Sequence, residues 1–409
     1  MITTSLDCTK SGRIDSFEVY KVPVTNIGGK ETKIGRVLGG NINWNYNSDN
    51  KISGSVKVSG EKPADGHTLL RIYYTPSLDG VDYKIELATV YAELADATWE
   101  NGRWTGEYDI KGMAARFTES DLMANYTVGV GGSALSSLNK FMGNRGAARV
   151  IQVADKTYSK STVVAKAGDS EYKALSGLAK KLGAHIDVDT HGRMTVTKYV
   201  QPSNRPIVYT IPSGDSSVTL PGIDYTWDGY DKPNRVHLRF EEKGEWKYVS
   251  GKGGGWWWSR SDGTWPASCT EDIDGRHMKF NKDGYCTNPS DGTSRIKFTN
   301  VITATAVLPD SSPISKKKRG RYITSYEKIT DLNPRTQANL QKKANAKLLE
   351  LASRTSYYEF ECYFLPIQVG DVVKFKPGSN EIKGMVSEID LSLDVGARMK
   401  VRLLKLGDA

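Results

Sequence analysis

Two pairs of closely spaced carboxylates are the first residues in this sequence that could do chemistry. Asp187 with Asp189, and Asp272 with Asp274, have the spacing at which carboxylates can serve hydrolysis or hold a metal ion. The first pair begins a segment that reads as a hairpin, where Asp and Gly are the residue types that a turn needs. The second pair precedes Gly275 and resembles a fragment of a calcium-binding loop, but the downstream bidentate Glu is missing. We therefore predict that both pairs belong to turns.

Cys269, His277 and Cys286 are the residues that a zinc site would use. Their spacings of eight and nine residues lack the short Cys-x₂₋₄-Cys pair of structural sites, and no fourth ligand is obvious nearby. A disulfide between the two cysteines stays open if the protein ends up outside a cell, but free thiols are the simpler interpretation. Four cysteines in 409 residues, with Cys8 and Cys362 as the others, make no disulfide framework, so a reducing compartment is the default.

Catalytic motifs are not visible in the chain. The five histidines are scattered, and there is no Gly-x-Ser-x-Gly elbow, Walker loop or His-Glu-x-x-His sequence. We predict no catalytic residue, no metal ligand and no cofactor, and thus a protein that is not an enzyme.

The most unusual segment is rich in Gly and Trp and runs from residue 251 to 260. Three adjacent indoles cannot all face one core, so at least one should be exposed or held by a partner. Trp and Arg are enriched at interface hot spots. We predict an interface made by Trp256, Trp257, Trp258, Arg260 and Trp265. Packing of the segment onto its own domain and an aromatic platform for sugar remain alternatives.

A dense basic cluster follows a Pro-Ser segment. Lys and Arg exceed Asp and Glu by 56 to 47, which gives a net charge of +9 and favours nucleic acid, an anionic surface or an acidic partner. The cluster is interpreted as a solvated loop between strands, or alternatively as a phosphate-facing basic loop. Its members are Lys316, Lys317, Lys318, Arg319 and Arg321.

Strands with period-two alternation dominate the first hundred residues. Residues 42–46 and 52–58 are predicted to form a hairpin, and 81–91 a strand long enough for a barrel or a strongly coiled sheet. Asn101-Gly102, between Trp99 and Trp104, is typical of a two-residue type I′ turn.

Helical periods appear between residues 110 and 200. Ser133 is predicted to cap a short helix that Gly143 follows, and Asp169 to open a second helix that Gly183 ends. A hairpin around residues 186–196 completes a small α+β domain.

Strands resume after the boundary at residues 201–206. They are expected at 236–240, 246–248 and 296–308. Asn333-Pro334 is predicted to begin a long helix with Leu340, Ala344, Leu348 and Leu351 on its apolar stripe. Alternating strands then close the chain.

The fold class is therefore α+β and mainly β, with two β-barrel-like domains, an inserted small α+β domain and one long helix in the C-terminal half. We place the domains at residues 1–110, 111–201, 202–330 and 331–409. The third domain carries the Trp/Gly-rich insertion at about 250–292. No apolar run approaches the roughly 20 residues of a membrane span, and the first residues show no signal peptide.

The order of these parts resembles a known family. The helix at 334–352, the strand at 356–361 and the segment 365–375, with its Leu-Pro and Gly-Asp-Val-Val, resemble the closing barrel of phage tail hub proteins. Upstream, residues 104–112 lead into short helices, and 171–199 form a helix plus hairpin, as in the baseplate hub or tail-associated protein of long-tailed phages and related injection machines. The resemblance covers nearly the whole chain except about 250–292.

The resemblance implies a homotrimer whose two barrel domains per subunit make a ring that joins the tail tube to the tip. Such a ring surrounds the channel for the tape measure protein and then DNA. The implied partners are a distal tail or tube protein, the tape measure protein and a tip fibre or receptor-binding protein, with transient passage of DNA and no stable membrane insertion. The implied location is the virion tail tip or baseplate, after synthesis in the host cytoplasm. The chain stops at Ala409, so we expect no appended fibre or wall-degrading domain. A module that binds carbohydrate or a cell surface through Trp256–Trp258 is the alternative.

Overall fold

The computed structural model is mainly β, with 50% of residues in strands and 14% in helices, as the alternation predicted. It describes residues 2, 4–24, 26–60, 67–211, 218–227, 229–250, 255–288, 297–330, 332–352, 356–376 and 381–406. The chain forms two compact units. Unit 1 comprises Met1–Tyr225 and Tyr358–Leu406, and unit 2 comprises Thr226–Tyr357.

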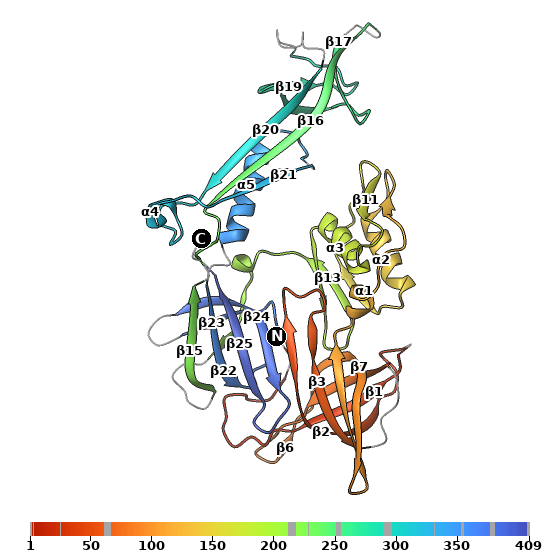
Figure 1. The fold of residues 1–409 in the computed structure, drawn as a ribbon, viewed down its shortest axis with the longest axis vertical. Coiled ribbons are helices and arrows are strands. Elements are labelled where there is room, and N and C mark those ends of the chain that lie inside the picture. Colours follow the sequence, from red (N-terminus) through yellow and green to blue (C-terminus); the bar gives the residue numbers. More distant parts are fainter. Residues whose placement is uncertain are drawn as a thin grey trace. The chain divides into compact units, whose positions relative to one another are not determined.

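Six strands at the start of unit 1 close into a ring (Figure 1). Their order is β1-β4-β7-β8-β3-β2, and β2 pairs back with β1. Their alternating apolar side chains fill the inside, where Ile42, Val56 and Ile72 are fully buried. The strands are β1 (Phe17–Val22), β2 (Thr32–Asn45), β3 (Ile52–Gly60), β4 (His67–Tyr74), β7 (Ile85–Glu100) and β8 (Arg103–Lys111). The predicted 42–58 hairpin is confirmed as β2–β3.

The strand predicted at 81–91 begins later than the alternation suggested. Residues 81–82 form β6 (Val81–Asp82), which pairs with β5 (Ser77–Leu78) across a tight turn. Asp79 and Gly80 both have positive φ in this turn, so the chain reverses before β7 starts at Ile85.

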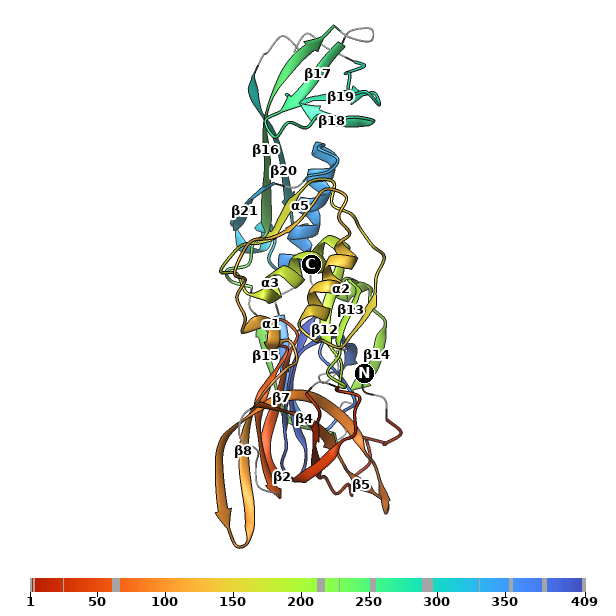
Figure 2. The ribbon, with the colours of Figure 1, turned by 90° about the vertical axis from the view of Figure 1, so that its right-hand side faces the viewer.

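The hairpin of β7 and β8 turns at Asn101-Gly102, as predicted. Their φ angles are 50° and 75°, which fits a type I′ turn. The rings of Trp99 and Trp104 lie 5.4 Å apart beside it. Figure 2 shows this long hairpin at the lower end of the ribbon.

A small α+β body follows in unit 1. Its elements are α1 (Ala115–Thr118), β9 (Tyr126–Val128), α2 (Ala134–Asn144), β10 (Arg149–Gln152), β11 (Thr162–Ala165), α3 (Glu171–Leu182), β12 (Ala184–Val188) and β13 (Met194–Lys198). α3 packs on β12 of the sheet β10-β13-β12, and α2 packs on α3, around a core of their own.

Two of the four predicted helix ends in this body are confirmed and two are wrong. The Ser133 hydroxyl accepts the N–H of Ser136, and Gly183 ends α3 in the left-handed conformation. The cap of α3 is Ser170, whose hydroxyl accepts the N–H of Lys173, whereas the Asp169 carboxylate pairs with the ammonium of Lys173. α2 continues past Gly143 to Asn144, because the left-handed residue that turns the chain is Gly146.

A second set of strands extends the ring into one 12-stranded sheet. β24 pairs with β2 of the ring, and the order continues β24-β25-β22-β15, with β23 and β14 on the other side of β24. Phe360, Cys362 and Phe364 are buried, as their alternation predicted. The elements are η1 (Pro202–Asn204), β14 (Ile207–Ile211), β15 (Thr219–Trp227), β22 (Ser356–Tyr363), β23 (Val372–Phe375), β24 (Ile382–Ser392) and β25 (Arg398–Lys405).

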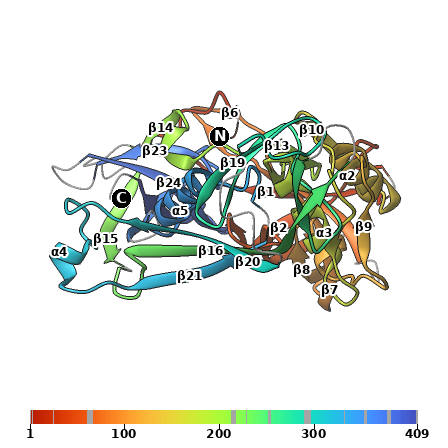
Figure 3. The same cartoon turned by 90° about the horizontal axis from the view of Figure 1, so that it is seen from above.

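Unit 2 is built on one long strand. β16 (Arg235–Val249) is one continuous strand that includes both strands predicted at 236–240 and 246–248. The polar residues between the two predicted strands also pair with β20 (Phe298–Val307), so the strand is not interrupted there. β21 (Thr324–Ile329) pairs with the first part of β16 (Figure 3). β17 (Gly255–Arg260) pairs with its last part. β18 (Cys269–Ile273) and β19 (Arg276–Phe280) form a hairpin, and α4 (Lys316–Arg319) is a single turn. Ile296, predicted to start the last strand, lies outside the described residues.

The long helix α5 (Gln337–Ala352) packs on β16 and β20. Leu340, Ala344 and Leu348 of the predicted stripe are buried, and Leu351 is half-buried against the same core. The predicted start at Asn333-Pro334 is wrong: the Thr336 hydroxyl accepts the N–H of Asn339, so the helix begins three residues later. None of the helices in the described ranges is long and apolar enough to cross a membrane.

Candidate functional site

The Trp segment lies on a strand, where alternation divides its indoles between two faces. In β17, Trp258 stands opposite Trp246 of β16, and Trp256 stands opposite Tyr248. Trp257, one residue away from each, points to the other face. The preceding residues 251–254 lie outside the described residues.

The inner face belongs to a core. Trp258 is fully buried, with its ring 4.8 Å from Phe298 and 5.4 Å from Trp246. Its indole N–H donates to Glu242 Oε1 at 3.3 Å. Trp256 is half-buried against the same cluster. These two indoles stabilise unit 2.

The outer face carries an aromatic cluster of Trp257, Trp265 and Tyr285. Trp257 stacks on Trp265 at 5.2 Å and meets Tyr285 edge-on at 5.4 Å. Gly284 allows this arrangement, because a Cβ there would lie 2.5 Å from the Trp265 ring. Trp265 is 48% exposed, and the buried Nε1 of Trp257 has no hydrogen-bond partner in the part of the chain that the structure describes. Of the predicted interface residues, Trp265 is the exposed one, and it lies in this outer cluster beside the half-buried Trp257.

Arg260 lies inside unit 2 in a buried network of four charges. Its guanidinium contacts Glu242 at 3.1 Å and Glu271 at 2.6 Å, and Arg335 also pairs with Glu242. Burial raises the pKa of Glu271. A buried, paired Arg holds β16, β17 and β18 together, so it does not offer its charge to a partner.

The residues considered for zinc do not assemble into a site. Within the described ranges, no group of three His, Cys, Asp or Glu side chains is placed to hold a metal ion. Cys269 and Cys286 are free thiols, and burial raises the pKa of both. His277 instead bonds through Nδ1 to Asp272, which also accepts the N–H of Gln337.

Neither predicted carboxylate turn is confirmed in full, because each has one of its two carboxylates in a strand. Asp274 and Gly275 both have positive φ in the β18–β19 turn, but Asp272 lies in β18. Asp189 accepts the N–H of Arg193 in the β12–β13 turn, whereas Asp187 lies within β12. In each pair, therefore, the first carboxylate lies in a strand and the second lies in the turn.

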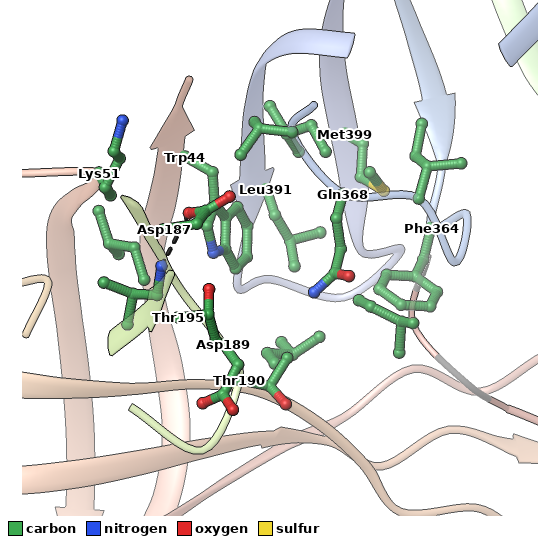
Figure 4. Close-up of a pocket in the computed structure, with 17 residues that line it drawn as sticks. Trp44, Lys51, Asp187, Asp189, Thr190, Thr195, Phe364, Gln368, Leu391 and Met399 are labelled. Atoms are coloured by element: carbon green, nitrogen blue, oxygen red, sulfur yellow. Dashed lines mark hydrogen bonds between the residues drawn. The ribbon is translucent and has the colours of Figure 1, made fainter. Parts of the chain in front are cut away.

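Asp187 lines a cavity of about 200 Å³ in unit 1 that the sequence did not predict (Figure 4). The walls are mostly apolar, and burial raises the pKa of Asp187. Burial, with Lys51 and Arg205 nearby, lowers the pKa of His185 to about 4. Segments far apart in the chain supply the lining residues, so no local sequence pattern could reveal the cavity. The lining residues include Trp44, Lys51, Asp187, Thr195, Phe364, Gln368, Leu391 and Met399.

The predicted basic loop is a capped helical turn between β20 and β21. The Ser315 hydroxyl accepts the N–H of Lys318, and Gly320 ends the turn in the left-handed conformation. The exposed members are Lys316, Lys317, Lys318 and Arg321; Arg319 is half-buried.

Comparison with solved structures shows the same fold across nearly the whole chain. The tail protein from Neisseria meningitidis MC58 is similar with a TM-score of 0.57 and 14% identity over 96% of each chain. The 43 kDa tail protein of prophage MuSo2 from Shewanella oneidensis is similar with a TM-score of 0.58 and 11% identity over 95% of this chain and 98% of that one. No protein-family model and no curated protein matches the sequence. Over nearly its whole length, this chain therefore has the fold of phage tail proteins, as its order of parts suggested.

Proposed function

We propose that the chain is a structural hub of a phage tail tip or baseplate. Three copies form a ring of barrel-like domains that joins the tail tube to the tip and surrounds the channel for the tape measure protein and DNA. The observation that carries this proposal is the end-to-end likeness to two phage tail proteins. In this function the chain acts through its surfaces and not as an enzyme.

An exposed sheet edge in unit 1 supports assembly. β15 pairs with β22, and no described strand lies on its other side. Ile223 and Tyr225 alternate along its part in unit 1 and are each more than 40% exposed. Bare apolar edges favour association, and natural proteins usually cover them. A three-fold ring needs two different contact surfaces per subunit, of which this edge supplies one.

Mass photometry and electron microscopy test the ring. We expect a species of three times 45.1 kDa, about 135 kDa, with three-fold symmetry and a central hole. Tyr225→Ser should weaken it, whereas Tyr326→Ser, at a similarly exposed tyrosine on β21, should not. A chain that stays monomeric both alone at high concentration and with purified tail tubes contradicts the proposal.

The outer aromatic cluster is proposed to contact a neighbouring tail protein, such as the distal tail protein or a tip fibre. Trp265→Ala should reduce incorporation into tails, because a large exposed ring in a prearranged cluster is a typical hot spot. Trp99→Ala is the matched control, with an equally exposed indole on the β7–β8 hairpin. Normal tails from the Trp265 variant would argue against this contact. Point variants are preferable to deletion, because β17 and β18 contribute to a core.

Glycan binding is the second candidate function, favoured by the exposed Trp265 ring that Trp257 supports from behind. Flat indole faces suit sugar rings. Binding on a glycan array that Trp265→Ala abolishes would favour this function, and an empty array would leave only the protein contact.

A further inference from the structure

The basic turn is part of a larger basic cluster in unit 2. Residues 229–235 and 309–323 together hold seven cationic and two acidic side chains, so this cluster carries five of the nine net positive charges of the chain. The cations are Lys232, Arg235, Lys316, Lys317, Lys318, Arg319 and Arg321. The acids are Asp231 and Asp310.

A buried asparagine holds both segments of the basic cluster in place. Asn234 is fully buried, and its amide donates to the carbonyls of Ile314 and Arg321, both at 2.9 Å. Its oxygen accepts the N–H of Ile323 at 2.8 Å. Ile314 is buried in the core under α5. A loop that was only solvated would need no buried hydrogen bonds of this kind. We infer that these bonds fix the backbone that carries the cations.

The cations interleave with aromatic rings. Arg235 lies over the Tyr322 ring at 4.3 Å, with Lys316 at 5.0 Å from the same ring. Arg321 lies over Tyr230 at 5.5 Å. These contacts orient the charged groups while leaving Tyr230 71% exposed.

Little negative charge within the cluster offsets these cations. Lys317 and Asp310 are 4.0 Å apart, and both side chains are at least 70% exposed, so their ion pair is weak. Arg319 donates one Nη1–H to the Lys232 carbonyl at 2.6 Å, while its buried Nη2 has no partner among the described residues. Positive charges held this closely favour a polyanion.

We propose that the basic cluster binds the phosphate backbone of nucleic acid. Lys and Arg neutralise phosphates and release counterions, and exposed tyrosines beside them offer faces on which bases can stack. The aromatic interleaving favours nucleic acid over a glycerol-phosphate polymer, which has no bases. The binding needs no ring, so it can be measured whether or not three copies assemble.

Fluorescence anisotropy of a labelled 20-base-pair duplex tests the proposal on the full chain. If five phosphates are neutralised, the slope of log affinity against log salt is about −4.5, and affinity falls about 500-fold between 50 and 200 mM salt. The triple variant K316Q/K317Q/K318Q should lower the slope to about −1.8, so that affinity falls only about 12-fold.

The control triple variant K140Q/K160Q/K198Q removes the same charge from exposed lysines of the α+β body in unit 1. It should bind the duplex like the unaltered chain; an equal loss of affinity in both triple variants would show a response to net charge alone and overturn the proposal. Tyr230→Ala should weaken binding of a single strand more than binding of the duplex. If poly(glycerol phosphate) displaces the labelled duplex as effectively as unlabelled DNA does, the proposal is also overturned, and a surface polymer becomes the favoured ligand.

Discussion

Replacing Asn234 with Ala is expected to destabilise unit 2 by about 4–6 kcal/mol. The side chain makes three hydrogen bonds in a fully buried position, each contributing about 1 kcal/mol. Ala also leaves the N–H of Ile323 without its side-chain acceptor, and an unsatisfied buried group costs a further 1–3 kcal/mol or so.

Urea unfolding followed by tryptophan fluorescence measures this loss. Six of the nine tryptophans lie in unit 2, so the emission reports mainly its unfolding. With a dependence of about 2 kcal/mol per molar urea for a domain of this size, the midpoint should fall by about 2–3 M.

Two further variants show whether the cause is the hydrogen bonding. Asn345→Ala, at an exposed position on α5, should change the free energy of unfolding by less than about 0.5 kcal/mol. Asn234→Asp keeps an acceptor for Ile323 but turns an oxygen towards the carbonyls of Ile314 and Arg321, so it should be at least as unstable as the Ala variant. A loss below about 1 kcal/mol for Asn234→Ala, or a stable Asp variant, would refute the reasoning.

Three other predictions concern the core of unit 2, a half-buried histidine and a turn. Leu340→Ala should cost about 2–5 kcal/mol in urea unfolding because the side chain is fully buried, whereas Leu349→Ala, 53% exposed on the same helix, should cost little. In the folded chain the pKa of His185 is about 4, against an ordinary 6.5. Its contribution of about 3 kcal/mol to the free energy of unfolding is therefore complete above pH 6.5 and is lost as the pH falls to 4. His185→Gln should make the stability of unit 1 less dependent on pH over that range. Gly102→Ala should lower the melting temperature through about 1 kcal/mol of strain at φ 75°, whereas Gly129→Ala, with open space and no positive φ, should not.

Local chemistry explains which parts of the fold could be predicted. The caps at Ser133 and Gly183 and the turn at Asn101-Gly102 depend on residues within one turn of the chain. Asp169 and Ser170 are both good caps, so sequence alone could not decide between them. The start of α5 depends on Asp272, which accepts the Gln337 N–H from 65 positions away.

The candidate sites were harder to predict because tertiary contacts create them. The run of Gly and Trp gave no sign of the strand alternation that buries Trp258 and places the half-buried Trp257 on the opposite face. Arg260 looked like a surface charge, since its partners Glu242 and Glu271 lie on other strands. Nothing near Asn234 in the chain signals that it supports the basic turn some 80 residues later.

The side-by-side pairing of β15 and β22 has a consequence for synthesis on the ribosome. Unit 1 is discontinuous: 132 residues, Thr226–Tyr357, are translated between its two parts. At about 5–20 residues per second, roughly 7–26 s pass before β22 emerges to meet β15. The six-strand ring contains only residues of the first 111 and can fold at once, whereas the exposed β15 must wait. The nascent chain is therefore most vulnerable to misassociation during this interval, when the edge of β15 still lacks its partner strand.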